Sequence, residues 1–152
     1  MKKLVRFFPF FFYVFAFISF ILPVVYIKEG NYKIYYNMLV LIFGNSEQSF
    51  SIGLFIVFLL FLITIGISIT LEYKTSKIAE NIAIITGLAS GVLMFFTRML
   101  ANPNVTDYNI HIGLFLPGIF IIVGTIFLFI NKKILANKKD EWNEVNPKMD
   151  TL

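Results

Sequence analysis

The stretch SIGLFIVFLLFLITIGISITL, residues Ser51–Leu71, decides the fold because it carries no charged side chain over its whole length. A helix needs roughly 20 apolar residues to cross about 30 Å of bilayer hydrocarbon. Three further apolar runs of similar length are Phe8–Ile27, Ile78–Leu100 and Ile110–Ile130. The connections between the later three runs are short, which favours antiparallel neighbours. The pattern therefore predicts an all-α membrane protein, an antiparallel four-helix transmembrane bundle.

The composition of the whole chain points to the same class. Of the 152 residues, 58% are hydrophobic and only 14% are charged, and the mean hydropathy is +0.80. A soluble core of this size would not hide so much apolar surface. The chain has no cysteine and a single histidine, which excludes disulfides, thiol chemistry and imidazole-rich metal sites. Many Phe, Tyr, Ile, Asn and Lys residues indicate an AT-rich genome, which points to a low-GC bacterium.

The positions of lysine and arginine predict the orientation, because cytoplasmic flanks of membrane spans carry an excess of these residues. The basic residues assigned to the inner side are Lys2, Lys3, Arg6, Lys74, Lys77, Lys132, Lys133, Lys138, Lys139 and Lys148. Those on the opposite side are Lys28, Lys33 and Arg98. Both termini are therefore predicted to be cytoplasmic, with residues 1–131 as a transmembrane domain in the plasma membrane and residues 132–152 as a cytoplasmic tail. The net charge of +4 indicates anionic lipid rather than nucleic acid as the counter-charge.

The first outer loop, residues 28–50, is long and apolar. Turn-forming segments at Glu29–Asn31 and Gly44–Ser46 bound the run YKIYYNMLVLIF, which is rich in aromatic and β-branched residues. The run is compatible with a β-hairpin or strand on the outer face and with an interfacial helix. Its function is equally open: an exposed apolar strand attracts a partner, whereas a lid would pack over the chain's own helices.

Small residues recur along the third span at every fourth position. The series is Ala79, Ala83, Gly87 and Gly91. Residues at this spacing lie along one ridge of a helix, and small side chains there let another backbone approach closely. The approaching helix belongs to the same bundle, to another copy or to another protein. The second span has two comparable small faces, Gly66 with Thr70 and Thr64 with Ser68.

Residue types needed for catalysis or ion coupling are missing at membrane depth. The carboxylates near the spans fall at or outside the span ends; they are Glu29, Glu47, Glu72, Glu80 and Asp107. A coupled transporter usually places one near the bilayer midplane. No set of residues for nucleophilic or zinc-dependent hydrolysis lies in the spans, so we expect no enzyme, no cofactor and no metal. Arg98 falls at the outer interface, where Arg98, Asp107 and His111 form a candidate polar patch.

Three segments carry a resemblance: VLIFG before the second span, ASGVLMFFT in the third and IGLFLPGIFIIVG in the fourth. From Asn37 to Asn131 the chain resembles small four-span membrane proteins of low-GC Gram-positive bacteria and mollicutes. That family has no established activity, so the resemblance implies topology and origin alone. The long first loop is also similar to the claudin plan, but the loop lacks the Trp and two Cys of the claudin motif.

These features lead to one main hypothesis and two alternatives. We expect a non-catalytic accessory or scaffolding subunit of a membrane complex, whose partner is another membrane protein or a second copy. A small transporter or permeability protein is the first alternative, and it would need a polar face along one helix. The second is an immunity protein against a membrane-active peptide, which needs few polar residues.

Overall fold

The computed structural model describes residues 2–29, 31–44, 49–73, 76–100 and 109–145. The elements are α1 (Lys2–Ser19), β1 (Pro23–Glu29), β2 (Tyr32–Asn37), α2 (Met38–Phe43), α3 (Ile52–Tyr73), α4 (Lys77–Met94), α5 (Thr97–Leu100), β3 (Asn109–Ile110), η2 (Ile112–Leu114) and α6 (Leu116–Val145). The prediction of a mostly helical chain is confirmed. A small three-stranded sheet accompanies the helices.

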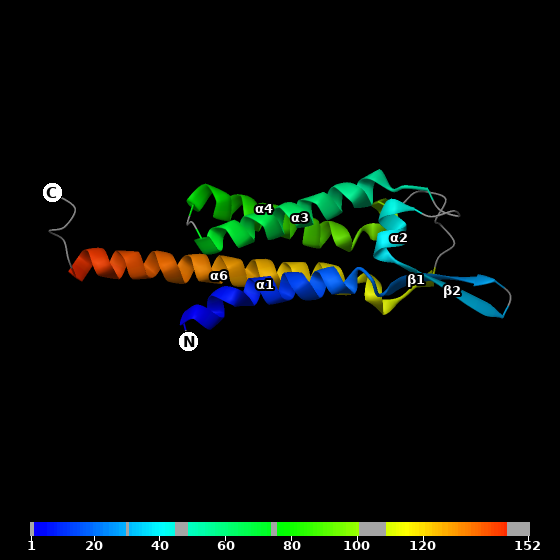
Figure 1. Ribbon diagram of the computed structural model, residues 1–152, viewed down its shortest axis with the longest axis horizontal. Coiled ribbons are helices and arrows are strands. Elements are labelled where there is room, and N and C mark those ends of the chain that lie inside the picture. The colour runs from blue at the N-terminus through cyan, green and yellow to red at the C-terminus, as the bar shows by residue number, and fades with distance from the viewer. Residues whose placement is uncertain (1, 30, 45–48, 74–75, 101–108, 146–152) are drawn as a thin grey trace.

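The four long helices lie side by side as two pairs, which we call the helical body (Figure 1). Helix α1 packs along α6 and α3 packs along α4, and contacts between α4 and α6 join the pairs. The start of α1 and the last turns of α6 lie at one end, here called the terminal end. The sheet and α2 lie at the other, the hairpin end. Successive long helices therefore run in alternating directions.

Among the described residues, three helical segments are long and apolar enough to cross a membrane: Ile52–Leu71, Lys77–Met94 and Ile112–Ile134. This agrees with a membrane location. In α1 the purely apolar part, Phe7–Ser19, is shorter than these three. Helix α6 continues without a break to Val145, so the predicted tail begins as an extension of the last helix.

The structure differs from the predicted first span, Phe8–Ile27. The helix ends at Ser19, whose hydroxyl donates a hydrogen bond to Ala16 O at 2.6 Å. Tight turns follow, and Pro23 has no N–H with which to continue a helix. The β-branched residues after it join a strand instead of the helix. The segment from Pro23 onward therefore belongs to the sheet and not to the first helix.

The third predicted span, Ile78–Leu100, is also divided. Helix α4 starts at an N-cap, Ser76, whose side chain accepts from the Ala79 N–H, and it ends at Met94. Thr97 then donates to Met94 O, and the short helix α5 follows. A hydrogen bond connects the residue just before α3 to the end of α5: Ser51 Oγ donates to Leu100 O at 2.8 Å.

The loop at residues 28–50 contains both structures that the sequence left open. Its first part completes a β-hairpin in which Tyr26 faces Tyr35 and Lys28 faces Lys33, and β3 pairs with the other edge of β1. Its second part forms α2, which Asn37 caps by accepting from the Val40 N–H at 2.9 Å.

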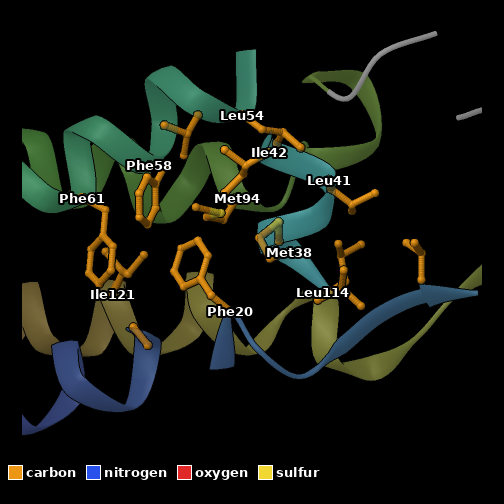
Figure 2. Close-up of a cluster of buried hydrophobic side chains, with 14 of the residues drawn as sticks. Phe20, Met38, Leu41, Ile42, Leu54, Phe58, Phe61, Met94, Leu114 and Ile121 are labelled. Atoms are coloured by element: carbon orange, nitrogen blue, oxygen red, sulfur yellow. The ribbon is translucent and has the colours of Figure 1, made fainter. Parts of the chain in front are cut away.

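Helix α2 closes the hairpin end of the helical body. Figure 2 shows Met38 and Ile42 lying among side chains from the ends of the long helices. The buried residues of this cluster labelled there are Phe20, Met38, Leu41, Ile42, Leu54, Phe58, Phe61, Met94, Leu114 and Ile121. The second part of the loop therefore packs as a lid over the chain's own helices.

Candidate functional site

The hairpin extends beyond the helices along the long axis of the molecule (Figure 1). Because cross-strand partners share a face and side chains alternate along a strand, its two faces can be assigned from the register. One face carries Val25, Ile27, Ile34 and Tyr36, which are buried or pack against the core cluster. The other carries Tyr26, Lys28, Lys33 and Tyr35, and we call it the outward face.

The outward face combines aromatic rings with ammonium groups. The Tyr26 and Tyr35 rings lie 5.7 Å apart between centroids, and Lys33 Nζ lies 5.1 Å from the Tyr26 centroid. A cation at this distance from a tyrosine ring is attracted by its π face. Tyr35 is 50% exposed, and Tyr32, near the turn, is 80% exposed. Exposed tyrosines of this kind supply rigid contact area that is common at protein interfaces.

The strand β2 is an edge of the sheet. The strand order is β2-β1-β3, so β1 covers one side of β2, and no strand among the described residues pairs with its other side. Edge strands present backbone groups to which another chain can add. The outward face and this edge together make the hairpin the candidate interaction site.

His111 has a structural role in the support of the hairpin. Its backbone N–H donates to Val24 O at 2.9 Å, and its Nδ1 accepts from the Gly113 N–H at 3.3 Å as the N-cap of η2. Its ring meets the Tyr35 ring edge-on at 6.1 Å. The predicted patch is described only in part. Arg98 lies in α5, but its side chain is outside the described residues, as is all of Asp107.

The small-residue ridge of α4 faces other helices of the same chain. A Cβ on Gly87 would lie 2.4 Å from Thr125 Oγ1, and one on Gly91 would lie 2.7 Å from Ile122 Cγ1. Ala83 is fully buried and Ala79 is half-buried. The two glycines thus occupy the contact between α4 and α6.

Hydroxyl groups from all four long helices meet near Gly87. The members of this hydroxyl cluster are Tyr13 of α1, Thr64 and Ser68 of α3, Thr86 of α4 and Thr125 of α6. Thr125 Oγ1 donates to Ile121 O at 2.8 Å, so the proton in its 3.2 Å bond with Tyr13 comes from the tyrosine. Thr64 and Thr86 share a hydrogen bond of 2.8 Å between α3 and α4.

The sequence prediction found only part of this cluster. Of the two small faces considered for α3, Thr64 and Ser68 point inward, whereas Gly66 is exposed with nothing within 4 Å of a Cβ. Tyr13 and Thr125 were not singled out. The signal was present, since each is an isolated hydroxyl in the middle of a phenylalanine-rich or isoleucine-rich helix.

Ligand chemistry is otherwise sparse in the part of the chain that the structure describes. There, no three His, Cys, Asp or Glu side chains come together in an arrangement that could hold a metal ion. No family model, no curated protein and no solved structure matches this chain.

Proposed function

We propose that this chain is a non-catalytic, multi-pass protein of a bacterial cell membrane that acts as an accessory or scaffolding subunit. In this proposal α1, α3, α4 and α6 each cross the bilayer, and both termini are cytoplasmic. The hairpin then stands on the outer side and contacts the partner protein. The observation that carries the proposal is the outward face, an aromatic and basic surface held beyond the end of the helical body.

Membrane crossing by α1 is supported by its packing against α6. The Phe8 and Phe12 rings stack on Phe127 at centroid distances of 5.4 and 5.3 Å, so α1 and α6 share the same depth. At about 1.5 Å per residue, the 18 residues of α1 extend over roughly 27 Å, close to the hydrocarbon thickness. The basic residues of its first turns, Lys2, Lys3 and Arg6, are of the type that snorkels to head groups at the end of a span.

Contact with a partner through the hairpin is supported by the packing of the other apolar surfaces, which lie against the chain's own helices. The glycines of the α4 ridge lie against α6, so the ridge does not offer them to another protein. Helix α2 and the inner face of the hairpin cover the chain's own core. That packing does not use the outward face or the edge of β2 that no described strand pairs with, and both are suited to protein contact.

Site-specific photo-crosslinking in living cells tests this function. A benzophenone amino acid replaces Tyr32 or Tyr35, which preserves an aromatic side chain at each position. The matched control is the same replacement at Ile85, a residue of α4 that is 66% exposed on the side of the helical body. We expect one discrete protein adduct from the hairpin positions and none from Ile85. An adduct with the chain's own mass would identify the partner as a second copy.

The absence of any discrete adduct from both hairpin positions would contradict the proposal. An equally strong adduct of the same mass from Ile85 would also contradict it, because contact would then not be specific to the hairpin.

A further inference from the structure

A groove runs between α1 and α3 on the side of the helical body where these two helices share few contacts. Its volume is about 290 Å³. Phe10, Tyr13, Val14, Phe17 and Ile18 of α1 form one wall, and Leu62 and Ile65 of α3 form the other. Several lining residues are exposed, including Phe10 at 44% and Ile18 at 50%, so the groove opens sideways. In a bilayer this opening faces hydrocarbon.

The lining favours a flexible hydrocarbon chain over a partner helix. Transmembrane helices associate closely where small residues let the backbones approach, and this groove is lined only by bulky side chains. Among the side chains that line the groove, only Tyr13 has a polar atom, and its hydroxyl is bonded to Thr125. The groove therefore presents only apolar surface, and its irregular shape suits an acyl chain that can bend to fill it.

Two basic residues of α1, Lys3 and Arg6, precede its groove residues in the sequence. Lys3, Arg6, Phe10, Tyr13 and Phe17 follow one another at spacings of three and four residues, which places them along one stripe of α1. Arg6 precedes Phe10 by about one helical turn, roughly 6 Å along the axis. The lipid that fits this stripe has an anionic head group at the terminal end and an acyl chain running toward Phe17.

We propose that α1 and α3 form a binding site for an anionic phospholipid of the leaflet at the terminal end. One acyl chain occupies the groove, and the phosphate-bearing head group is held near Lys3 and Arg6. The site rests on that part of the proposed function in which α1 crosses the bilayer with its N-terminus at the cytoplasmic face. It does not depend on the hairpin or on any protein partner.

The test uses the full chain reconstituted in vesicles of phosphatidylglycerol and phosphatidylcholine. Trace amounts of either lipid carry a diazirine on one acyl chain, and the crosslinked peptides are mapped by mass spectrometry. We expect phosphatidylglycerol adducts concentrated on the groove walls of α1 and α3, with fewer from phosphatidylcholine. The exposed face of α4 around Ile85 reports the labelling expected from bulk lipid.

Two sets of variants separate the head group from the chain. Replacing Lys3→Gln or Arg6→Gln should reduce the preference for phosphatidylglycerol by about fivefold per basic residue removed. Replacing Ile65→Trp should fill the groove and suppress adducts there, while Ile85→Trp leaves them unchanged.

Equal labelling of the groove and of the α4 face would overturn the proposal, as would equal labelling by the two lipids. Since the unmodified chain gives this comparison directly, a variant that failed to fold would not decide the outcome. If the hairpin positions gave no protein adduct while the groove was labelled as expected, the scaffolding role would be contradicted and the lipid site would not.

Discussion

Replacing Gly87 with alanine should destabilise the helical body, because three neighbouring atoms stand where the new methyl group must go. The added carbon would lie 2.4 Å from Thr125 Oγ1 and 3.1 Å from methyl carbons of both Thr125 and Thr64. Ordinary contacts begin at 3.4 Å, so α4 and α6 must separate by about 1 Å or Thr125 must rotate. Rotation would break its hydrogen bonds with Ile121 O and the Tyr13 hydroxyl.

The size of the effect is measured best against Gly66→Ala. Gly66 also lies within a long helix, but a Cβ there meets nothing within 4 Å. Both variants gain the helix propensity of alanine, up to about 1 kcal/mol. The difference between them isolates the overpacking at Gly87, and we expect it to be about 2 kcal/mol in the free energy of unfolding.

Reversible unfolding by SDS in mixed micelles, followed by circular dichroism, measures these free energies. A second change, Thr125→Ala, removes the two closest atoms. We therefore expect the cost of Gly87→Ala to fall by about 1–2 kcal/mol in that background. Equal stabilities of the Gly87→Ala and Gly66→Ala variants would refute the packing of α4 on α6. So would a Gly87→Ala cost that is independent of Thr125.

Three further changes test other contacts. Tyr13→Phe removes the hydrogen bond to Thr125 and should cost about 0.6 kcal/mol in the same unfolding assay, which is the average for such bonds in a membrane protein. A cost below the experimental error of that assay would show that the bond contributes nothing to stability. Gly113→Ala places a Cβ 2.1 Å from Pro23 O and should cost about 3 kcal/mol. A cost no larger than that of Gly66→Ala would argue against the close approach of Gly113 to the Pro23 carbonyl. Met38→Ala leaves a cavity at the fully buried first residue of α2 and should cost about 2–5 kcal/mol, with faster hydrogen exchange throughout α2. Unchanged exchange would mean that α2 does not act as a lid.

The helices were predictable from the sequence where a long uncharged run leaves no other structure for the chain. Ser51–Leu71 is the clearest case, and α3 begins and ends within two residues of that prediction. The end of the first helix was not predictable in the same way. Val24 to Ile27 is a short run rich in β-branched and aromatic residues, and such a run fits a buried helix or a strand equally well. The strand partners at Tyr32–Asn37 and Asn109–Ile110 decide the matter, and the second of these is far away in the sequence.

The candidate interaction site and the contacts between the long helices were predictable in their residue types but not in their arrangement. The small residues of α4 showed that another helix comes close, but the spacing did not say which one. The pairing of α1 with α6 brings Tyr13 to Thr125 across most of the chain, and nothing in either segment alone specifies that neighbour. The division of residues 28–50 into a strand and a lid helix depends on the cap at Asn37, a single residue between the aromatic-rich part of the run and its aliphatic part.

Cysteine accessibility tests the central claim most directly, namely that four helices cross the membrane with the hairpin outside and both termini inside. The chain has no cysteine, so each introduced thiol is the only one. The positions are Tyr32, at the hairpin, and Lys77 and Lys2, at the terminal end. Cysteine at Tyr32 should react with an impermeant maleimide on intact cells, and cysteine at Lys77 or Lys2 only after permeabilisation. Reaction at Lys2 on intact cells would show that α1 does not cross, and the reverse of the whole pattern would invert the topology.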